Sequence, residues 1–151
     1  MLPVDRARAI TLYLKPAQGV ALWRLVLEAH EGHAHQAIGY ESWALYCGRE
    51  LGMSKSRSYQ LLNQAQVNLQ VAAVVKELTG QEIELRLREA VCRRLKPGLP
   101  EALEALRNLL STGVEVDIAI DRMLATHAAP HGKVGAVGGP ATPQIGEAAA
   151  P

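Results

Sequence analysis

Cysteines and long apolar runs are scarce in this sequence, and each shortage narrows the class of protein. The 151 residues include 2 cysteines, Cys47 and Cys92, which lie far apart in helix-like sequence. Two isolated cysteines provide no disulfide framework, which fits a reducing cytoplasm. No stretch approaches the ~18 consecutive apolar residues of a membrane span. The N-terminus also lacks the basic and apolar regions of a signal peptide, so we expect a cytoplasmic protein with no membrane partner.

Motifs of enzymes, cofactor sites and metal sites are also missing. We find no GxSxG or P-loop motif, and no GxGxxG stretch between a strand and a helix. The sequence "HEGHAH" contains His30, His33 and His35 outside any CxxC or HExxH frame, and we interpret it as a helix end followed by a loop. Cys47 and Cys92 fall on apolar helical faces, which is typical of small core residues. We therefore expect no enzymatic activity, no cofactor and no metal.

Acidic residues are absent from one stretch of an otherwise balanced chain. The formal net charge is +1, so any binding to nucleic acid must come from a local surface. No Asp or Glu occurs from Leu51 through Lys76, whereas the same stretch contains Lys55, Arg57 and many Ser, Gln and Asn residues. This composition indicates a segment that faces an anionic partner able to form hydrogen bonds.

Apolar residues recur with helical spacing along most of the chain, and the pattern predicts an all-α fold. We expect a compact domain of about six or seven helices that includes a helix-turn-helix. The last segment, "VEVDIAIDRMLATH", alternates at first as a strand would, but its later spacing and its flanks favour a helix. The expected helices are 5–14 with Asp5 as its cap, 16–33, 41–51, 54–78, 81–96, 100–112 and 114–127.

Three parts of the chain are distinguished in this interpretation. Residues 1–79 are expected to form a helix-turn-helix DNA-binding domain. Residues 80–126 are expected to form a helical region for packing and oligomerisation, with a dimer favoured. Residues 127–151 are rich in Gly, Ala and Pro, which predicts a disordered tail.

The helix-turn-helix is predicted from the sequence "SWALYCGRELGMSKSRSYQLLNQ", which reads as two short helices joined by a turn containing glycine. Gly52 suits the positive φ of that turn. Gly48 is small where the two helices are expected to approach each other. Ser54 is expected to cap the second helix, whose free N–H groups would bind a phosphate.

Candidate DNA contacts follow from the outward side of that second helix. Its first turn carries basic residues where the helix dipole ordinarily favours acids, and a DNA phosphate would offset the cost. Carboxamides form paired hydrogen bonds to adenine, and Arg or Lys to guanine. Arg49, on the preceding helix, is placed to contact the flanking DNA backbone. The candidate residues are Arg49, Ser54, Lys55, Ser56, Arg57, Gln60, Asn63 and Gln64.

A family resemblance covers about a third of the chain, roughly from Val20 to Val75, and its motif runs from Gly39 to Val67. The stretch "GYESWALYCGRELGMSKSRSYQLLNQAQV" resembles helix-turn-helix DNA-binding proteins of bacterial phages, plasmids and other mobile elements. The shared pattern is W..YC...LG.S.S..Y.L, and Ser58 stands where such proteins often have Ala. The resemblance implies sequence-directed binding to double-stranded DNA by a transcriptional or maintenance regulator, in the cytoplasm of a bacterial cell or phage-infected host.

Two other classes of protein share these features. One is a DNA-packaging protein similar to the small subunit of a phage terminase, which would form rings. The other is a helical adaptor that binds proteins and not DNA. Oligomer size and the salt dependence of DNA binding distinguish the three classes.

Overall fold

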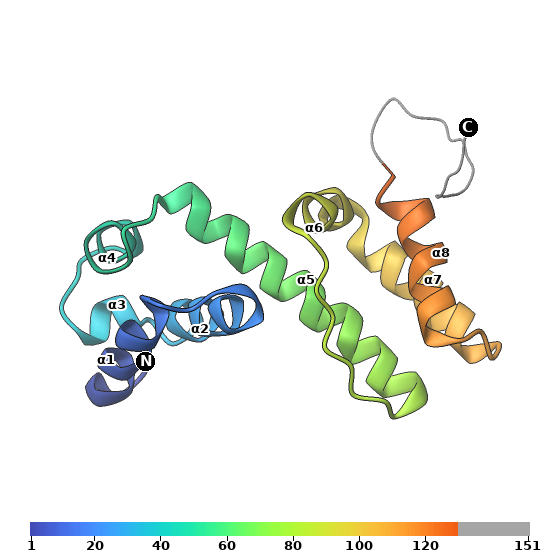
Figure 1. Cartoon of the computed structure of the whole chain (residues 1–151), viewed down its shortest axis with the longest axis horizontal. Coiled ribbons are helices and arrows are strands. Elements are labelled where there is room, and N and C mark those ends of the chain that lie inside the picture. The colour runs from blue at the N-terminus through green and yellow to red at the C-terminus, as the bar shows by residue number, and fades with distance from the viewer. Residues whose placement is uncertain (130–151) are drawn as a thin grey trace. The chain divides into compact units, whose positions relative to one another are not determined.

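All regular structure in the described part of the chain is helical, as the sequence predicts. The computed structural model describes residues 1–129, without the side chain of residue 20. The all-α class is confirmed for this range, and no helix in it is long and apolar enough to cross a membrane. In chain order the elements are α1 (Val4–Leu14), α2 (Gly19–Glu31), α3 (Ala34–Ala37), α4 (Trp43–Tyr46), the π-helix η1 (Cys47–Leu51), α5 (Lys55–Thr79), α6 (Glu89–Leu95), the 3-10 helix η2 (Lys96–Gly98), α7 (Leu99–Ser111) and α8 (Val116–His127) (Figure 1).

Two units make up the described chain, and their boundary differs from the predicted one. The first unit comprises Met1–Ala73 and Glu84–Arg93, and the second comprises Val74–Ile83 and the chain from Arg94 onward. The boundary within α5 could not be read from the sequence, because the helix is continuous through Thr79 and its sequence shows no break where the packing changes.

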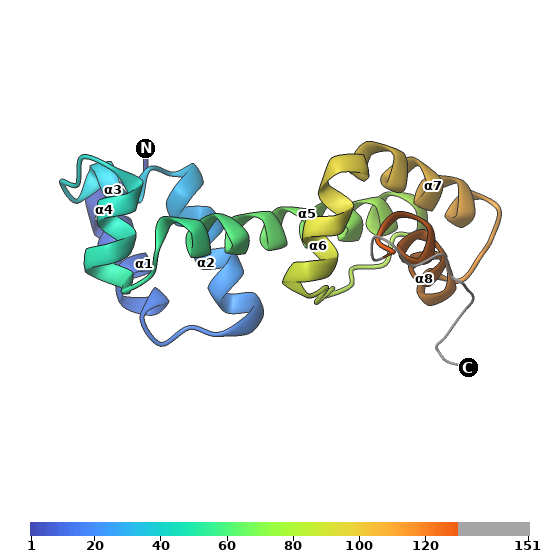
Figure 2. The ribbon, with the colours of Figure 1, turned by 90° about the horizontal axis from the view of Figure 1, so that it is seen from above.

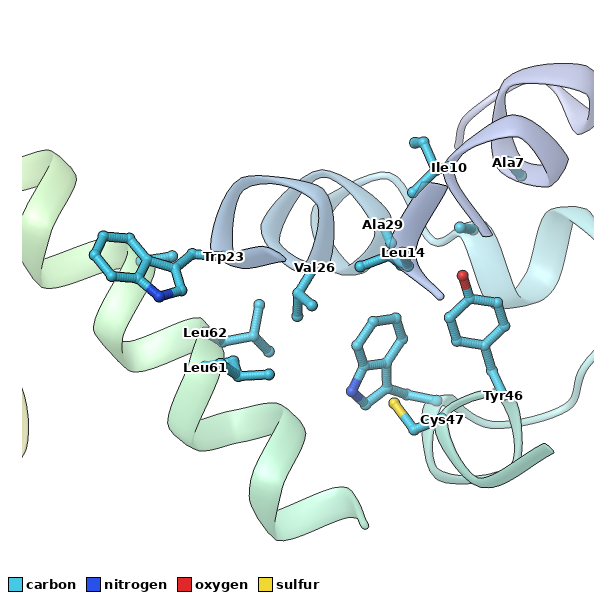
Figure 3. Packing of buried hydrophobic residues seen from close by; sticks show 13 residues of the cluster. Ala7, Ile10, Leu14, Trp23, Val26, Ala29, Tyr46, Cys47, Leu61 and Leu62 are labelled. Atoms are coloured by element: carbon cyan, nitrogen blue, oxygen red, sulfur yellow. The ribbon is translucent and has the colours of Figure 1, made fainter. Parts of the chain in front are cut away.

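The core of the first unit lies among α1, α2, α4 and the beginning of α5. Leu62 of α5 points toward Val26 of α2 (Figure 3). On α4, the Tyr46 hydroxyl lies 2.8 Å from Thr11 Oγ1, and Thr11 donates its own proton to a carbonyl one turn earlier in α1. Tyr46 is therefore the donor of that pair, since a hydroxyl carries one proton. The buried residues of this core are Ala7, Ile10, Leu14, Trp23, Val26, Ala29, Ala34, Trp43, Tyr46, Cys47, Leu61, Leu62 and Ala65.

The beginning of α1 and one short helix differ from expectation. α1 begins at Val4 after Pro3, so Asp5 lies in the first turn and does not cap the helix. Its carboxylate still lies at the end of the helix dipole that favours an anion. The helix α3 was not predicted. It is a single turn after His33, whose φ is 53°, and four residues are too few to show a helical period.

The segment before α6 is extended, whereas the sequence predicted a helix over 81–96. α6 begins only at Glu89. Leu85 and Leu87 are half-buried and the charged residues beside them are exposed, which is the period of two of an extended chain. The prediction was wrong because leucines separated by good helix formers suit both structures, and a contact from elsewhere in the chain selects one. We call residues 84–88 the strap.

Asn68 of α5 supplies that contact. Its Oδ1 accepts the backbone N–H of Leu87 at 2.7 Å, and its Nδ2 donates to the Leu87 carbonyl at 3.2 Å. One side chain thus pairs with both backbone groups of a residue, as a neighbouring strand would. Asn68 is 3% exposed, so its amide depends on these partners. The strap consequently runs extended beside α5 (Figures 1 and 2).

The second unit contains α7 and α8, which lie side by side (Figures 1 and 2). The segment with ambiguous periodicity is helical from Val116 to His127, as predicted. After α8, the Ala128 carbonyl accepts a hydrogen bond from Arg94 Nε at 2.7 Å. The tail predicted from residue 127 therefore begins later than expected, and its remainder lies outside the described residues. The buried residues of the pair are Leu99, Ala102, Leu106 and Leu110 on α7 and Ala119, Ile120 and Met123 on α8.

The two glycines of the predicted helix-turn-helix have different roles. Gly52 has a φ of 64°, which confirms the expected left-handed turn. At Gly48 an added Cβ would meet no atom within 4 Å and the φ is not positive, so the expectation of a close helix approach there is wrong. Gly52 is needed for its backbone conformation, whereas Gly48 is not needed for space.

Matched alanine substitutions test this difference. Gly52→Ala should lower the free energy of unfolding by about 1–2 kcal/mol, because a Cβ is unfavourable in the left-handed region. Gly48→Ala should raise the free energy of unfolding by about 0.4–1 kcal/mol, because it restricts the unfolded chain without strain in the folded one. Urea denaturation followed by circular dichroism measures both. Equal destabilisation by the two substitutions would contradict the assignment.

Candidate nucleic-acid interface

The beginning of α5 is fixed by Ser54. The Ser54 Oγ accepts the backbone N–H of Arg57 at 3.0 Å, and the Ser54 carbonyl accepts that of Ser58 at 3.1 Å. The prediction that Ser54 caps this helix is confirmed. The other N–H groups of a helical first turn have no partner within the helix, and together with the dipole they favour an anion at this end.

The turn before α5 joins two helical segments directly. α4 continues into η1, which ends at Gly52. The carbonyl of Cys47, the first residue of η1, accepts the N–H groups of Gly52 and, at 3.1 Å, of Met53, and these bonds close the turn after η1. Residues 52–54 alone separate η1 from α5. The chain therefore has the predicted order of helix, tight turn and second helix.

Most of the predicted contact residues are on the surface of this arrangement. Three of these residues, Arg49, Lys55 and Arg57, are cations. None of the three forms an ion pair within residues 1–129. The nearest acid in sequence, Glu50, lies 3.9 Å from Lys15 and accepts a hydrogen bond from the Tyr40 hydroxyl. No described acidic side chain thus pairs with these cations. The exposed residues, which we call the basic surface, are Arg49, Ser54, Lys55, Ser56, Arg57 and Gln60.

Asn63 and Gln64 do not project freely outward, contrary to the prediction. Gln64 Nε2 donates to the Leu87 carbonyl of the strap at 3.0 Å. The Oδ1 of Asn63 is buried and has no hydrogen-bond partner within the described chain. The helical period placed both side chains on the open side of α5, but the strap lies against Gln64, and the Asn63 Oδ1 is buried. The accessible part of the predicted site therefore ends at Gln60.

Ser58 anchors α5 to α4, a role that the sequence did not reveal. The Trp43 indole Nε1 donates to the Ser58 hydroxyl at 2.9 Å, and this hydroxyl donates to the Lys55 carbonyl at 2.6 Å. Ser58 is fully buried and Trp43 is 7% exposed. The available signal was a single hydroxyl on the apolar side of the helix.

Two of the three histidines, His30 and His35, pack against Trp43, and the third, His33, lies beside His35. The ring centroid of His30 lies 5.0 Å from that of Trp43 and 5.7 Å from that of Tyr59, both edge-on, and His35 lies 6.0 Å from Trp43. Burial, and secondarily the nearby His33, lowers the pKa of His30 and of His35. Among residues 1–129, no group of three or more potential ligands is placed to hold a metal ion. His30 and His35 therefore serve as packing partners of the indole.

Both cysteine thiols are inside the protein. Burial raises the pKa of Cys92 to about 11 and also raises the pKa of Cys47. Because the thiolate is the nucleophile, these two neutral thiols are not prepared for covalent chemistry.

Comparison with known protein families, with curated proteins and with solved structures finds no match to this chain. Three features characterise the candidate interface: the exposed start of α5, the cations Lys55 and Arg57 without ion pairs within residues 1–129, and the exposed polar side chain of Gln60 about one turn further along.

The anchoring role of Ser58 can be tested by substitution. Ser58→Ala should lower the free energy of unfolding by about 1–3 kcal/mol, because the buried indole N–H loses its acceptor. Ser56→Ala, at an exposed position of the same helix, is the matched control and should change stability by less than about 0.5 kcal/mol. Urea denaturation followed by tryptophan fluorescence gives both values. A Ser58→Ala protein as stable as the control would remove the anchoring role.

Proposed function

We propose that this chain binds double-stranded DNA in a sequence-directed manner through the basic surface. The single observation that carries the proposal is the beginning of α5, where exposed Lys55 and Arg57 flank a Ser54 cap and form no ion pair within residues 1–129. Helix N-termini bind phosphate through free N–H groups and the dipole. Two added cations make this end suited to the DNA backbone.

The position of the cations supports a charged partner. A cation in the first turn of a helix opposes the dipole at a cost of about 0.3–1 kcal/mol. Lys55 and Arg57 both carry this cost, and no acid between Leu51 and Lys76 offsets it. A bound phosphate removes the conflict, since it interacts favourably with the dipole and with both side chains.

Base recognition is assigned to the exposed polar side chains of the first two turns. In a helix-turn-helix, the N-terminal residues of the second helix contact base edges in the major groove. Gln60 is exposed and its carboxamide can form two hydrogen bonds to adenine, while Ser56 offers a hydroxyl to several bases. Arg49 at the end of η1 is assigned to the flanking backbone. Asn63 and Gln64 are left out because the Asn63 Oδ1 is buried and Gln64 bonds to the strap.

The expected biological role is that of a transcriptional or maintenance regulator of a phage, plasmid or other mobile element, acting in the cytoplasm. This part of the proposal rests on the resemblance of residues 39–67. A regulator of this kind gains affinity when two copies bind half-sites about 34 Å apart. We therefore propose a homodimer.

The oligomeric state separates a regulator from a packaging protein. Size-exclusion chromatography with light scattering should give twice the mass of one chain. A monomer that persists at high concentration would contradict the dimer. A large ring would favour the packaging class instead, in which subunits surround DNA.

DNA binding itself is tested with duplexes selected from a random pool and with fluorescence anisotropy over a range of salt concentrations. Lys55→Ala and Arg57→Ala should each weaken binding and reduce the slope of log K against log salt by about 1, because one phosphate contact is lost. Gln60→Ala should instead reduce discrimination between the selected duplex and a mixed sequence by about 1–3 kcal/mol.

Arg8→Ala is the matched control for the charge change. Arg8 is exposed on α1 and forms no ion pair within residues 1–129. Its loss should leave both the salt slope and the affinity nearly unchanged. If no duplex is retained even at low salt, the proposed function is wrong, and a role in protein binding takes its place.

A further inference from the structure

One side of α5 is open in its first two turns and covered in the next two. Ser56, Gln60, Gln64 and Asn68 are spaced by four residues and so lie in one row along the helix. Ser56 and Gln60 are exposed, whereas Gln64 and Asn68 bond to the strap. Each step of the row rises about 6 Å along the axis. The strap therefore begins about one turn beyond the last exposed residue of the basic surface.

Leu87 is the point at which the strap is fixed to this row. Its carbonyl accepts hydrogen bonds from Gln64 Nε2 at 3.0 Å and Asn68 Nδ2 at 3.2 Å, and its N–H donates to Asn68 Oδ1 at 2.7 Å. Three hydrogen bonds from two side chains fix both the height and the rotation of the strap at this residue.

Arg88 follows immediately and is exposed. Neighbouring residues of an extended chain point to opposite sides, so the half-buried Leu87 leaves Arg88 on the solvent side. The other arginines nearby in sequence have partners: Arg86 pairs with Glu84 at 3.0 Å, Arg93 pairs with Glu89 at 3.2 Å, and Arg94 donates to the Ala128 carbonyl at 2.7 Å. Arg88 forms no ion pair with any residue from 1 to 129.

We infer that Arg88 is a further DNA contact, to a backbone phosphate, and that Asn68 is the residue that positions it. The inference rests on the proposed function and extends the binding surface from α5 onto the strap. DNA that reaches Gln60 approaches the same side of the helix on which the strap lies one turn further along. A long cation without an internal partner at this place is suited to a phosphate next to the bases that α5 reads.

The test compares Arg88→Ala with Arg8→Ala in the full chain. The probe is a mixed-sequence duplex of about 30 base pairs, followed by anisotropy, since backbone contacts bind any sequence. Loss of one phosphate contact should reduce the salt slope by about 0.9 and weaken binding about eightfold in ~0.1 M salt. Arg88→Lys retains the charge and should retain most of the affinity. Arg8→Ala removes the same charge elsewhere and should have little effect.

The outcomes separate this inference from the proposed function. In one outcome the wild-type chain binds the duplex and Lys55→Ala weakens this binding, but Arg88→Ala has as little effect as Arg8→Ala. The inference is then overturned and the proposed function stands. If the wild-type chain does not bind the duplex at any salt concentration, both are overturned. The phosphate contact is supported if Arg88→Ala loses affinity for the duplex in a salt-dependent way and Arg88→Lys retains that affinity.

The positioning role of Asn68 has its own readout. In an Asn68→Ala background, Leu87 loses its hydrogen bonds to the Asn68 amide, so the strap no longer holds Arg88 in place. Circular dichroism checks that this variant folds. Arg88→Ala should then reduce the salt slope by clearly less than it does in the wild-type background. An undiminished effect of Arg88→Ala in that background would show that Asn68 has only a structural role.

Discussion

The hydrogen bond from the Trp43 indole to the Ser58 hydroxyl determines the rotation of α5 within the first unit. Ser58 must face the core to reach Trp43, and Leu61, Leu62 and Ala65 then follow on the same side with helical spacing. The opposite side of the first two turns is consequently left to solvent. The exposure of Ser56 and Gln60, on which the proposed function depends, is thus a result of core packing on the other side of the helix.

A second polar contact inside the first unit sets where the exposed side ends. Asn68 pairs with the backbone of Leu87, and this contact places the strap over the third and fourth turns of α5. Without a partner the buried Asn68 amide would be strongly unfavourable, so the contact is also a requirement for stability. The same residue therefore limits how far the exposed side of α5 extends and fixes Leu87, the residue before Arg88.

The sequence predicted the order of helix, tight turn and second helix well, because its signals are local. A glycine in a turn, a serine cap and an apolar row with helical period act within a few residues of one another, and Gly52, Ser54 and Leu61 lie where they were expected. The strap was missed for the opposite reason. Its conformation depends on Asn68, which is 19 residues away along the chain from Leu87. The same long-range contact made the prediction for Gln64 incorrect, since a helical period gives the direction of a side chain but not what covers it.

The residue types in the first turn of α5 make the helix less stable than acidic residues would, but they favour binding of an anion. Acids in the first turn would favour the dipole, and an acid at the position of Lys55 or Arg57 would make the helix more stable. The chain instead has two cations there, and no acidic side chain of residues 1–129 pairs with them. Local departures from stabilising choices concentrate at functional sites, because function there constrains the residue type more than folding does. With a net charge of only +1, the protein has no general excess of cations from which this arrangement would arise by composition alone. The conflict at the helix start is therefore itself an argument that an anion binds at this place.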